Sequence, residues 1–285
     1  MTQPHGDEIT LSEFLGYLLR ARWLIFFVTI AFTLTAAISS FLIPKKYQAS
    51  IVLSPVSSTA SSGLMGGLSS VASQFSDIAS IAGISTSSDS KKSESLATLQ
   101  SEALTEQYIQ RENLLPVLFR DKWNAQKNQW DVSNPKNIPT VWKGNQYFKK
   151  TVRSTVTDTK SGLVTLNITW SDPRLAAKWA NDLVKSTNDY LRNKAIKQSE
   201  SNIAFLSEQA LKTPEVGIKQ GIYTLLQNEI KQAMLARATE EFALKVIDPA
   251  VAPERAVFPD KPVWTISGFV GGLLVSILFV LVRSK

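Results

Sequence analysis

Two long, uncharged apolar runs near the ends of the sequence constrain the fold more than any other feature. One covers residues 23–43 and the other covers residues 263–282, and neither contains an acidic or a basic side chain. About 20 helical residues are enough to cross the ~30 Å hydrocarbon core of a bilayer. Trp23 and Trp264 begin the two runs, and amphipathic rings favour the lipid headgroup layer. The sequence therefore predicts two transmembrane helices.

A cleaved signal peptide is the alternative interpretation of the first run. Its apolar stretch exceeds the usual length of about 7–15 residues, and it ends in Phe41-Leu-Ile-Pro44 rather than in small residues. We therefore expect this run to stay in the chain. Two spans place both termini on one side of the membrane, and the basic residues nearest the spans mark that side as cytoplasmic. These residues are Arg20, Arg22, Arg283 and Lys285.

Both predicted spans carry small residues at four-residue spacing, which allows two helices to approach closely in lipid. These residues are Ala31, Thr35 and Ser39 in the first span and Gly268, Gly271, Gly272 and Ser276 in the second. Pairing of the spans, within or between subunits, is one interpretation. The general richness of membrane helices in small residues is the other, and the sequence leaves both open. Neither span holds an ionisable residue that would suggest a proton or ion pathway.

The composition excludes several kinds of catalytic or metal site. The chain has no cysteine, and its only histidine is His5, so thiolate chemistry and histidine-based metal sites are excluded. Neither a phosphate-binding Gly-rich loop nor a Gly-x-Ser-x-Gly motif is present. The net charge is +7, without a basic stripe interleaved with aromatic residues, so nucleic-acid binding is not expected. We predict a protein that is not an enzyme, with no catalytic residue, cofactor or metal.

The segment between the spans, residues 44–262, reads as an α+β domain. Its base is predicted from residues 44–172 and 242–250. Alternating apolar and polar residues predict strands over residues 47–53, 151–157, 162–170 and 242–247. Apolar residues at helical spacing predict helices over residues 92–119 and 141–148, and a short helix near residues 68–81 in a Ser-, Gly- and Ala-rich stretch.

A long helical arm is predicted between residues 173 and 241. Asp172 and Pro173 form a strong helix start, and no Gly or Pro interrupts the next 40 residues until Pro214. A second helix, residues 216–241, then returns. Such a helix cannot lie wholly within a small domain, so it must project or pack on neighbours. A proline-rich, stiff segment over residues 249–262 leads to the second span.

Several short motifs follow one another in an order that resembles one family. An amphipathic segment, residues 1–22, contains the capping box Thr10-Leu-Ser-Glu13 and ends at Arg20-Ala-Arg22, beside the first span. The later motifs are Lys46-Tyr47-Gln-Ala, Asp172-Pro173, Ala180-Asn181, Ile247-Asp248-Pro249-Ala250, Pro253, and the prolines 259 and 262. Together, their order and spacing against the two spans resemble the Wzz-type chain length determinants, the bacterial polysaccharide co-polymerases.

The resemblance implies a protein of the bacterial inner membrane with both termini cytoplasmic and residues 44–262 in the periplasm. It implies a homo-oligomeric scaffold that acts with a membrane polysaccharide polymerase, and it allows direct contact with the growing polysaccharide. The scaffold would set the chain length of O-antigen, common antigen or exopolysaccharide. Because only residues 283–285 follow the second span, the kinase-free type is expected. A polysaccharide export or envelope adaptor is the alternative function.

Within this hypothesis the helical arm forms subunit contacts or the outer wall of the assembly, and the chain length depends on oligomer geometry. The candidate residues on its exposed faces are Lys194, Lys197, Glu208 and Lys219. Membrane-proximal candidates, matched to the family motif, are Ile247, Asp248, Pro249, Pro253, Pro259 and Pro262.

Overall fold

The computed structural model describes residues 21–56 and 88–283. It divides into two compact units, one formed by Met1–Tyr47 with Glu254–Lys285 and the other by Gln48–Pro253. The amphipathic N-terminal helix and the short helix expected near residues 68–81 lie outside the described residues.

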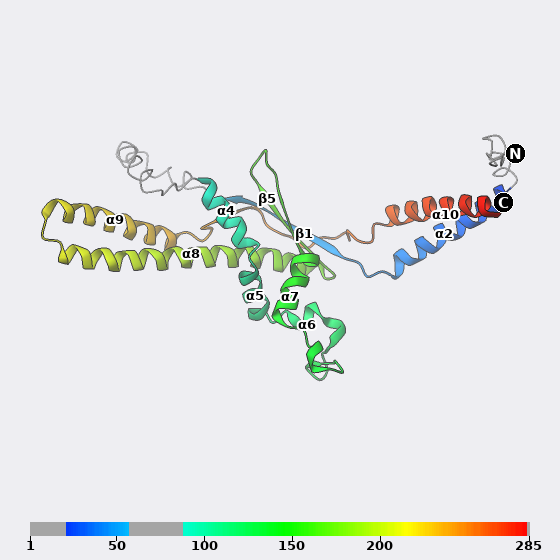
Figure 1. The fold of residues 1–285 in the computed structure, drawn as a ribbon, viewed down its shortest axis with the longest axis horizontal. Helices are drawn as coiled ribbons and strands as arrows, with labels where there is room; N and C mark the ends of the chain where they lie inside the picture. The colour runs from blue at the N-terminus through cyan, green and yellow to red at the C-terminus, as the bar shows by residue number, and fades with distance from the viewer. Residues whose placement is uncertain (1–20, 57–87, 284–285) are drawn as a thin grey trace, which may run out of the picture. The chain divides into compact units, whose positions relative to one another are not determined.

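The first unit is a pair of long apolar helices, α2 (Arg22–Leu42) and α10 (Lys261–Arg283). Both are long and apolar enough to cross a membrane, each with a mean hydropathy of 2.1. The two helices pack along one another (Figure 1). The two predicted spans are therefore confirmed as helices, and each of their four ends differs from the predicted one by one or two residues.

A four-stranded sheet forms the centre of the second unit, in the order β4-β5-β1-β6. The strands are β1 (Tyr47–Pro55), β4 (Arg153–Thr157), β5 (Val164–Trp170) and β6 (Leu244–Asp248). β4 pairs antiparallel with β5, and β6 pairs antiparallel with β1. The predicted alternation is confirmed because one face of β1 and β5 is fully buried, through Ala49, Ile51, Leu53, Val164, Leu166 and Ile168. All four predicted strands are present.

The single helix expected over residues 92–119 is wrong. The chain forms α4 (Ser88–Leu99), α5 (Glu102–Arg111) and α6 (Leu115–Leu118) instead. Ser101 starts α5 as an N-cap, with its hydroxyl accepting a hydrogen bond from Leu104 N. The Arg153 guanidinium donates hydrogen bonds to the carbonyl oxygens of Leu99 and Gln100 at the C-terminal end of α4. These bonds stabilise the break between α4 and α5. Burial lowers the pKa of Arg153 to about 10.

A small lobe follows α6 along the chain. It contains the 3₁₀ turn η2 (Arg120–Lys122), a two-stranded hairpin of β2 (Trp123–Asn124) and β3 (Gln129–Trp130), and the 3₁₀ turn η3 (Pro135–Asn137). Helix α7 (Val141–Tyr147) and the π-helical turn η4 (Phe148–Val152) then lead into β4. Trp123 and Trp130 pack edge to face across the hairpin, with ring centroids 4.9 Å apart.

The predicted arm is a pair of helices, α8 (Pro173–Lys212) and α9 (Val216–Ala238), which pack against each other (Figure 1). The Asp172 carboxylate accepts hydrogen bonds from Arg174 N and Leu175 N, so the predicted cap is confirmed. The first half of α8 covers the sheet and buries Ala176, Trp179, Ala180, Leu183 and Val184 in the core. The second half of α8 packs against α9.

Candidate functional site

Close packing of α2 on α10 depends on two of the four predicted small residues of the second span. A Cβ atom on Gly272 would come within 2.7 Å of the Phe32 Cβ and 3.1 Å of the Thr29 Cα. A Cβ on Gly268 would overlap the Ala36 Cβ. Ser276 is fully buried. The structure thus places these three residues on the face of α10 that meets α2.

Gly271 and the expected face of the first span lie elsewhere. A Cβ on Gly271 would meet nothing within 4 Å, and Ala31 and Thr35 are exposed. The face of α2 toward α10 instead includes Thr29, Phe32, Thr33 and Ala36. The physical reason is that two four-residue series of small residues exist on α2, and only the one beginning at Thr29 faces the glycines. Ser39 is half-buried beside this face.

A clasp ties together the two segments that adjoin the membrane helices. Lys46 N donates to the Phe258 carbonyl oxygen at 2.9 Å, and Val257 N donates to the Lys46 carbonyl oxygen at 2.8 Å. The Lys261 ammonium lies 4.5 Å from the centroid of the Phe41 ring. Pro259 is buried and Pro262 lies in the first turn of α10, where its missing N–H costs no helical hydrogen bond.

Two asparagines of α8, two helical turns apart, hold the segment around β6. The Asn188 amide donates to the Leu244 carbonyl oxygen and accepts from the N–H groups of Ala243 and Leu244, all within 2.9 Å. The Asn181 amide donates to the Ala250 carbonyl oxygen and accepts from Ala250 N. The Ala180-Asn181 motif and the motif ending at Pro249-Ala250 are therefore in direct contact. We call this pair of asparagines the amide clamp.

The remaining membrane-proximal candidates, all within the described residues, do not form a cluster of polar side chains. Asp248 ends β6 and pairs in register with Val52. Ile247 is about half exposed, and Pro253 is half-buried.

The helical arm buries small side chains and exposes large apolar ones. The fully buried arm residues beyond the sheet are Ser199, Ala210, Ala233 and Ala236. In contrast, many large apolar residues are exposed, chiefly along α9, namely Phe205, Leu211, Val216, Ile218, Tyr223, Leu225, Ile230, Met234 and Leu235. Met234 is 64% exposed beside a shallow apolar hollow of about 470 Å³ formed with Ile230 and Leu235. Such a surface is typical of a protein–protein contact.

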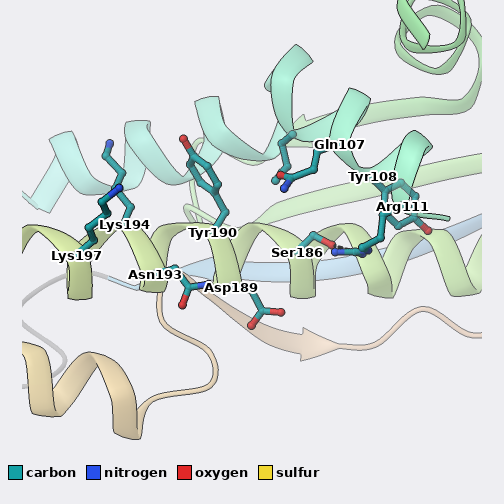
Figure 2. A pocket seen from close by; sticks show the side chains of 10 residues that line it. Gln107, Tyr108, Arg111, Ser186, Asp189, Tyr190, Asn193, Lys194 and Lys197 are labelled. Carbon is teal, nitrogen blue, oxygen red and sulfur yellow. Dashed lines mark hydrogen bonds between the residues drawn. The ribbon is translucent and has the colours of Figure 1, made fainter. Parts of the chain in front are cut away.

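A polar groove of about 450 Å³ lies between α5 and α8 (Figure 2). Its wall on α5 is one helical face, formed by Leu104, Gln107, Tyr108 and Arg111. Its wall on α8 follows the same helical spacing, through Ser186, Asp189, Tyr190, Asn193, Lys194 and Lys197. Figure 2 shows Tyr190, Lys194 and Lys197 extending from α8 on the side of α4 and α5. We call this feature the α5–α8 groove.

A network of charged side chains at one end of the groove joins its two walls. Arg111 donates to the Ser186 hydroxyl at 3.0 Å and to the Glu112 carboxylate at 3.2 Å. Lys178 bridges Glu112 and Asp182, at 3.1 and 2.7 Å. Hydrogen bonds from Lys178 and Arg111 lower the pKa of Glu112, and the bond to Asp182 raises the pKa of Lys178. Glu112 and Lys178 are therefore charged at neutral pH.

Tyr108 lies beneath this network as a neutral phenol. Its ring is buried, and its hydroxyl donates to the Asp182 carboxylate at 3.3 Å. Burial, followed by the charge of Asp182, raises the pKa of Tyr108 far above its ordinary value. The buried ring and its hydrogen bond make Tyr108 a fixed support for the groove wall.

The four candidate arm residues do not form one cluster. Lys194 pairs with Glu94 of α4 at 2.7 Å, which raises the pKa of Lys194, and Lys197 lines the far end of the groove. Glu208 pairs with Lys212 on the same helix. Lys219 is half-buried in the first turn of α9, so its expected exposed position is corrected.

Sequence reasoning missed the groove, although each wall has a signal. Gln107, Tyr108 and Arg111 follow Leu104 at helical spacing, and Tyr190, Asn193 and Lys194 repeat this spacing on α8. Each stripe alone is indistinguishable from an ordinary solvated helix face. Only the packing of α5 on α8 brings the two stripes together.

Comparison with known proteins finds two matching families. The chain length determinant protein family, Wzz, matches residues 7–112. The GNVR family, described as "G-rich domain on putative tyrosine kinase", matches residues 210–285. No curated protein sequence matches the chain.

Two solved structures are similar over much of the chain. A "full-length bacterial polysaccharide co-polymerase" is 12% identical with a TM-score of 0.40, and the similarity covers 98% of this chain and 97% of that one. A fragment of WzzB, a polysaccharide co-polymerase from Salmonella Typhimurium, is 9% identical with a TM-score of 0.31. That similarity covers 75% of this chain and 100% of the fragment.

The two matches cover different parts of the chain. The first contains α2 and β1, and the second contains α9, β6 and α10. Each match contains one of the two long apolar helices. Residues 7–112 thus resemble the Wzz chain length determinant proteins, and residues 210–285 resemble the GNVR domain.

Proposed function

We propose that this chain is a polysaccharide co-polymerase that sets the length of a bacterial surface polysaccharide. It does so as a homo-oligomeric scaffold beside the membrane polymerase, and its own residues perform no bond-making step. The polysaccharide is O-antigen, common antigen or an exopolysaccharide. The match of residues 7–112 to the Wzz chain length determinant family supports this function.

The observation that carries the assembly is the exposed apolar surface of α9. Leu225 and Met234 are more than half exposed, although Ala233 and Ala236 beside them are buried against α8. An isolated arm would keep this apolar area in water, at a cost of about 25 cal/mol per Å². A second copy of the chain removes that cost, because the face is repeated on every subunit and neighbouring subunits in a ring make the same contact.

We further propose that both termini lie in the cytoplasm of an inner-membrane protein and that residues 44–262 lie in the periplasm. The two apolar helices support a membrane location. The basic residues beside the spans, on the side of the termini, support the orientation.

Deletion of the gene separates this function from that of an export adaptor. Loss of a length regulator leaves polymer at the cell surface with a shifted length distribution, which a gel of surface polysaccharide reveals. Polymer of normal length retained inside the cell would identify an export adaptor and contradict the proposal.

Charge reversal on the arm tests whether its geometry controls length. We expect variants at Lys194, Lys197, Glu208 and Lys219 to shift the most abundant polymer length while synthesis continues. A distribution that is unchanged in variants that still assemble would refute a role for these residues.

A further inference from the structure

We propose that the α5–α8 groove binds a short stretch of polysaccharide that carries acidic sugars. The inference rests on the proposed function, since it names the place where the scaffold contacts its polymer. Four observations support it, namely the shape of the groove, its unengaged polar groups, its aromatic ring and its charge.

The groove has a size and a rigidity suited to a few sugar rings. Its volume is about 450 Å³, within the range of small-ligand sites. Both walls are regular helices, and the hydrogen bond from Arg111 to Ser186 joins them. The ion pair between Glu94 and Lys194 ties α8 to α4 beside the groove. The walls are therefore held in place before any ligand arrives, which lowers the entropic cost of binding.

Several polar side chains in the groove form no hydrogen bond with another described residue. They are the side chains of Gln107, Tyr190, Asn193 and Lys197. The two amides each offer donors and an acceptor, the Tyr190 hydroxyl offers both, and Lys197 offers three donors. A row of sugar hydroxyls needs this mixture of donors and acceptors along its length.

Tyr190 supplies the apolar part of the site. Its side chain is 49% exposed at the middle of the groove (Figure 2). One face of a pyranose ring presents C–H groups, and these pack on an aromatic ring while the hydroxyls at the edge turn to polar partners. Gln107 and Asn193 also line the groove, and their amides can form hydrogen bonds with sugar hydroxyls.

The charge of the lining favours an acidic glycan. Three cations and one carboxylate line the groove, and the carboxylate, that of Asp189, is paired with Arg192. Arg111 and Lys194 are paired with Glu112 and Glu94 outside the lining, so the available charge is that of Lys197. Lys197 has no carboxylate partner among the described residues. A uronate or another acidic substituent would form a charge-assisted hydrogen bond with Lys197. The polar lining also differs from the apolar α9 face, so a subunit contact is the weaker explanation of the groove.

Photo-crosslinking in living cells tests contact whatever the chemical structure of the polymer. Benzoylphenylalanine replaces Tyr190 in one variant and Tyr223 of α9 in a matched control, because both tyrosines lie on the arm and are similarly exposed, at 49% and 43%. After illumination of cells that make polymer, the Tyr190 variant is expected to carry a ladder of glycan-stained adducts that disappears when the polymerase is deleted. The Tyr223 variant is expected to crosslink to protein only.

Two outcomes would overturn the contact. One is a Tyr190 variant that crosslinks only to another copy of the chain, which would make the groove a subunit interface. The other is equal glycan labelling at both positions, which would make the contact non-specific.

Binding of oligosaccharides cut from the host strain's own surface polysaccharide tests the ligand class on the full chain in detergent. We expect Tyr190→Ala and Lys197→Gln each to weaken binding about tenfold. Lys185→Gln, an exposed lysine of α8 outside the groove, is the matched control and should bind like the parent. Chemical reduction of the glycan carboxyl groups should abolish the effect of Lys197→Gln but not that of Tyr190→Ala. An effect of Lys197→Gln that survives reduction, or equal binding by all variants, contradicts the inference.

The groove and the proposed function fail separately. If gene deletion shifts the polymer length but Tyr190 never labels glycan, the regulator stands and the groove inference is wrong. If deletion leaves the length unchanged, the proposed function itself is wrong.

Discussion

Gly272 lies directly against Thr29 across the pair of membrane helices, so that a Cβ atom added to Gly272 would come within 3.1 Å of the Thr29 Cα. Contacts this close replace side-chain packing with backbone packing, which is how small residues stabilise helix pairs in lipid. The relationship explains why only some of the small residues in these helices matter.

Replacement of Gly272 by Leu should force α2 and α10 apart. We expect a lower melting temperature in detergent and weaker assembly, seen as smaller species after chemical crosslinking, and the same for Gly268→Leu. Gly271→Leu is the matched control, because a Cβ there meets open space. If the Gly271 and Gly272 variants behave alike, the packing face is wrongly identified.

Replacement of Asn188 by Ala should strongly destabilise the domain. The change leaves two buried N–H groups and one carbonyl at residues 243–244 without their side-chain partner. We expect a loss of about 2–4 kcal/mol in unfolding free energy, measured by denaturant titration of the full chain. Asn202→Ala removes a hydrogen bond donated to Glu229 and one accepted from Gln198, neither of them fully buried, and should cost less than about 1 kcal/mol. Equal losses in both variants would argue against the amide clamp.

Ionised Glu112 should contribute to the pH dependence of the free energy of unfolding. Because Lys178 and Arg111 hold the pKa of Glu112 below its ordinary value of 4.5, the folded state binds this proton less tightly than the unfolded state does. The stabilisation is complete above the ordinary value and is lost as the pH falls through the lower folded value. Since both cations are more than half exposed, the contribution is under about 1 kcal/mol.

Glu112→Gln should remove this contribution, so that the variant loses less stability than the parent between pH 6 and pH 3, roughly the range in which carboxylates titrate. Denaturant titrations at several pH values measure the difference. A variant with the same acid dependence as the parent would show that the network contributes nothing to folding.

The exposed face of α9 should be required for assembly. We expect Met234→Glu and Leu225→Glu to reduce the oligomer to smaller species in light scattering, because each places a charge in an apolar contact. The fold of the single subunit should remain, since both side chains are more than half exposed. Asn228→Glu, an exposed polar position of the same helix, serves as the control. Unchanged oligomers in the first two variants would place the subunit contact elsewhere.

The absence of cysteine from the sequence allows a direct test of orientation. A single cysteine at Ser133, an exposed position in the lobe before α7, should react with a membrane-impermeant maleimide once the outer membrane is opened. A single cysteine at Thr2 should react only after the inner membrane is broken. The reverse pattern would invert the proposed topology.

Local signals in the sequence were sufficient for much of the fold. The start of α8 at Pro173 follows from the capping carboxylate of Asp172, and the burial of β5 follows from its alternation. The break between α4 and α5 could not be predicted, because it is held by Arg153, about 50 residues further along the chain. A side chain that acts on a distant segment leaves no periodic signal near that segment.

Some residues of the candidate site could likewise be predicted from the sequence, and others could not. Gly268 and Gly272 were predictable from their spacing, but the facing residues were not, since α2 carries two equivalent series of small residues. The α5–α8 groove arises only from the packing of two helices that are about 75 residues apart, as the bond from Arg111 to Ser186 shows. The amide clamp brings the Ala180-Asn181 motif into contact with the Pro249-Ala250 motif, although the two are far apart in the sequence.

The amide clamp has a further consequence for the dependence of the fold on acidity and salt. Asn181 and Asn188 hold their backbone partners through neutral amides, which neither titrate nor attract counter-ions. The attachment of β6 and of the segment at Ala250 to α8 should therefore persist at a pH or an ionic strength that weakens the exposed ion pairs of the arm.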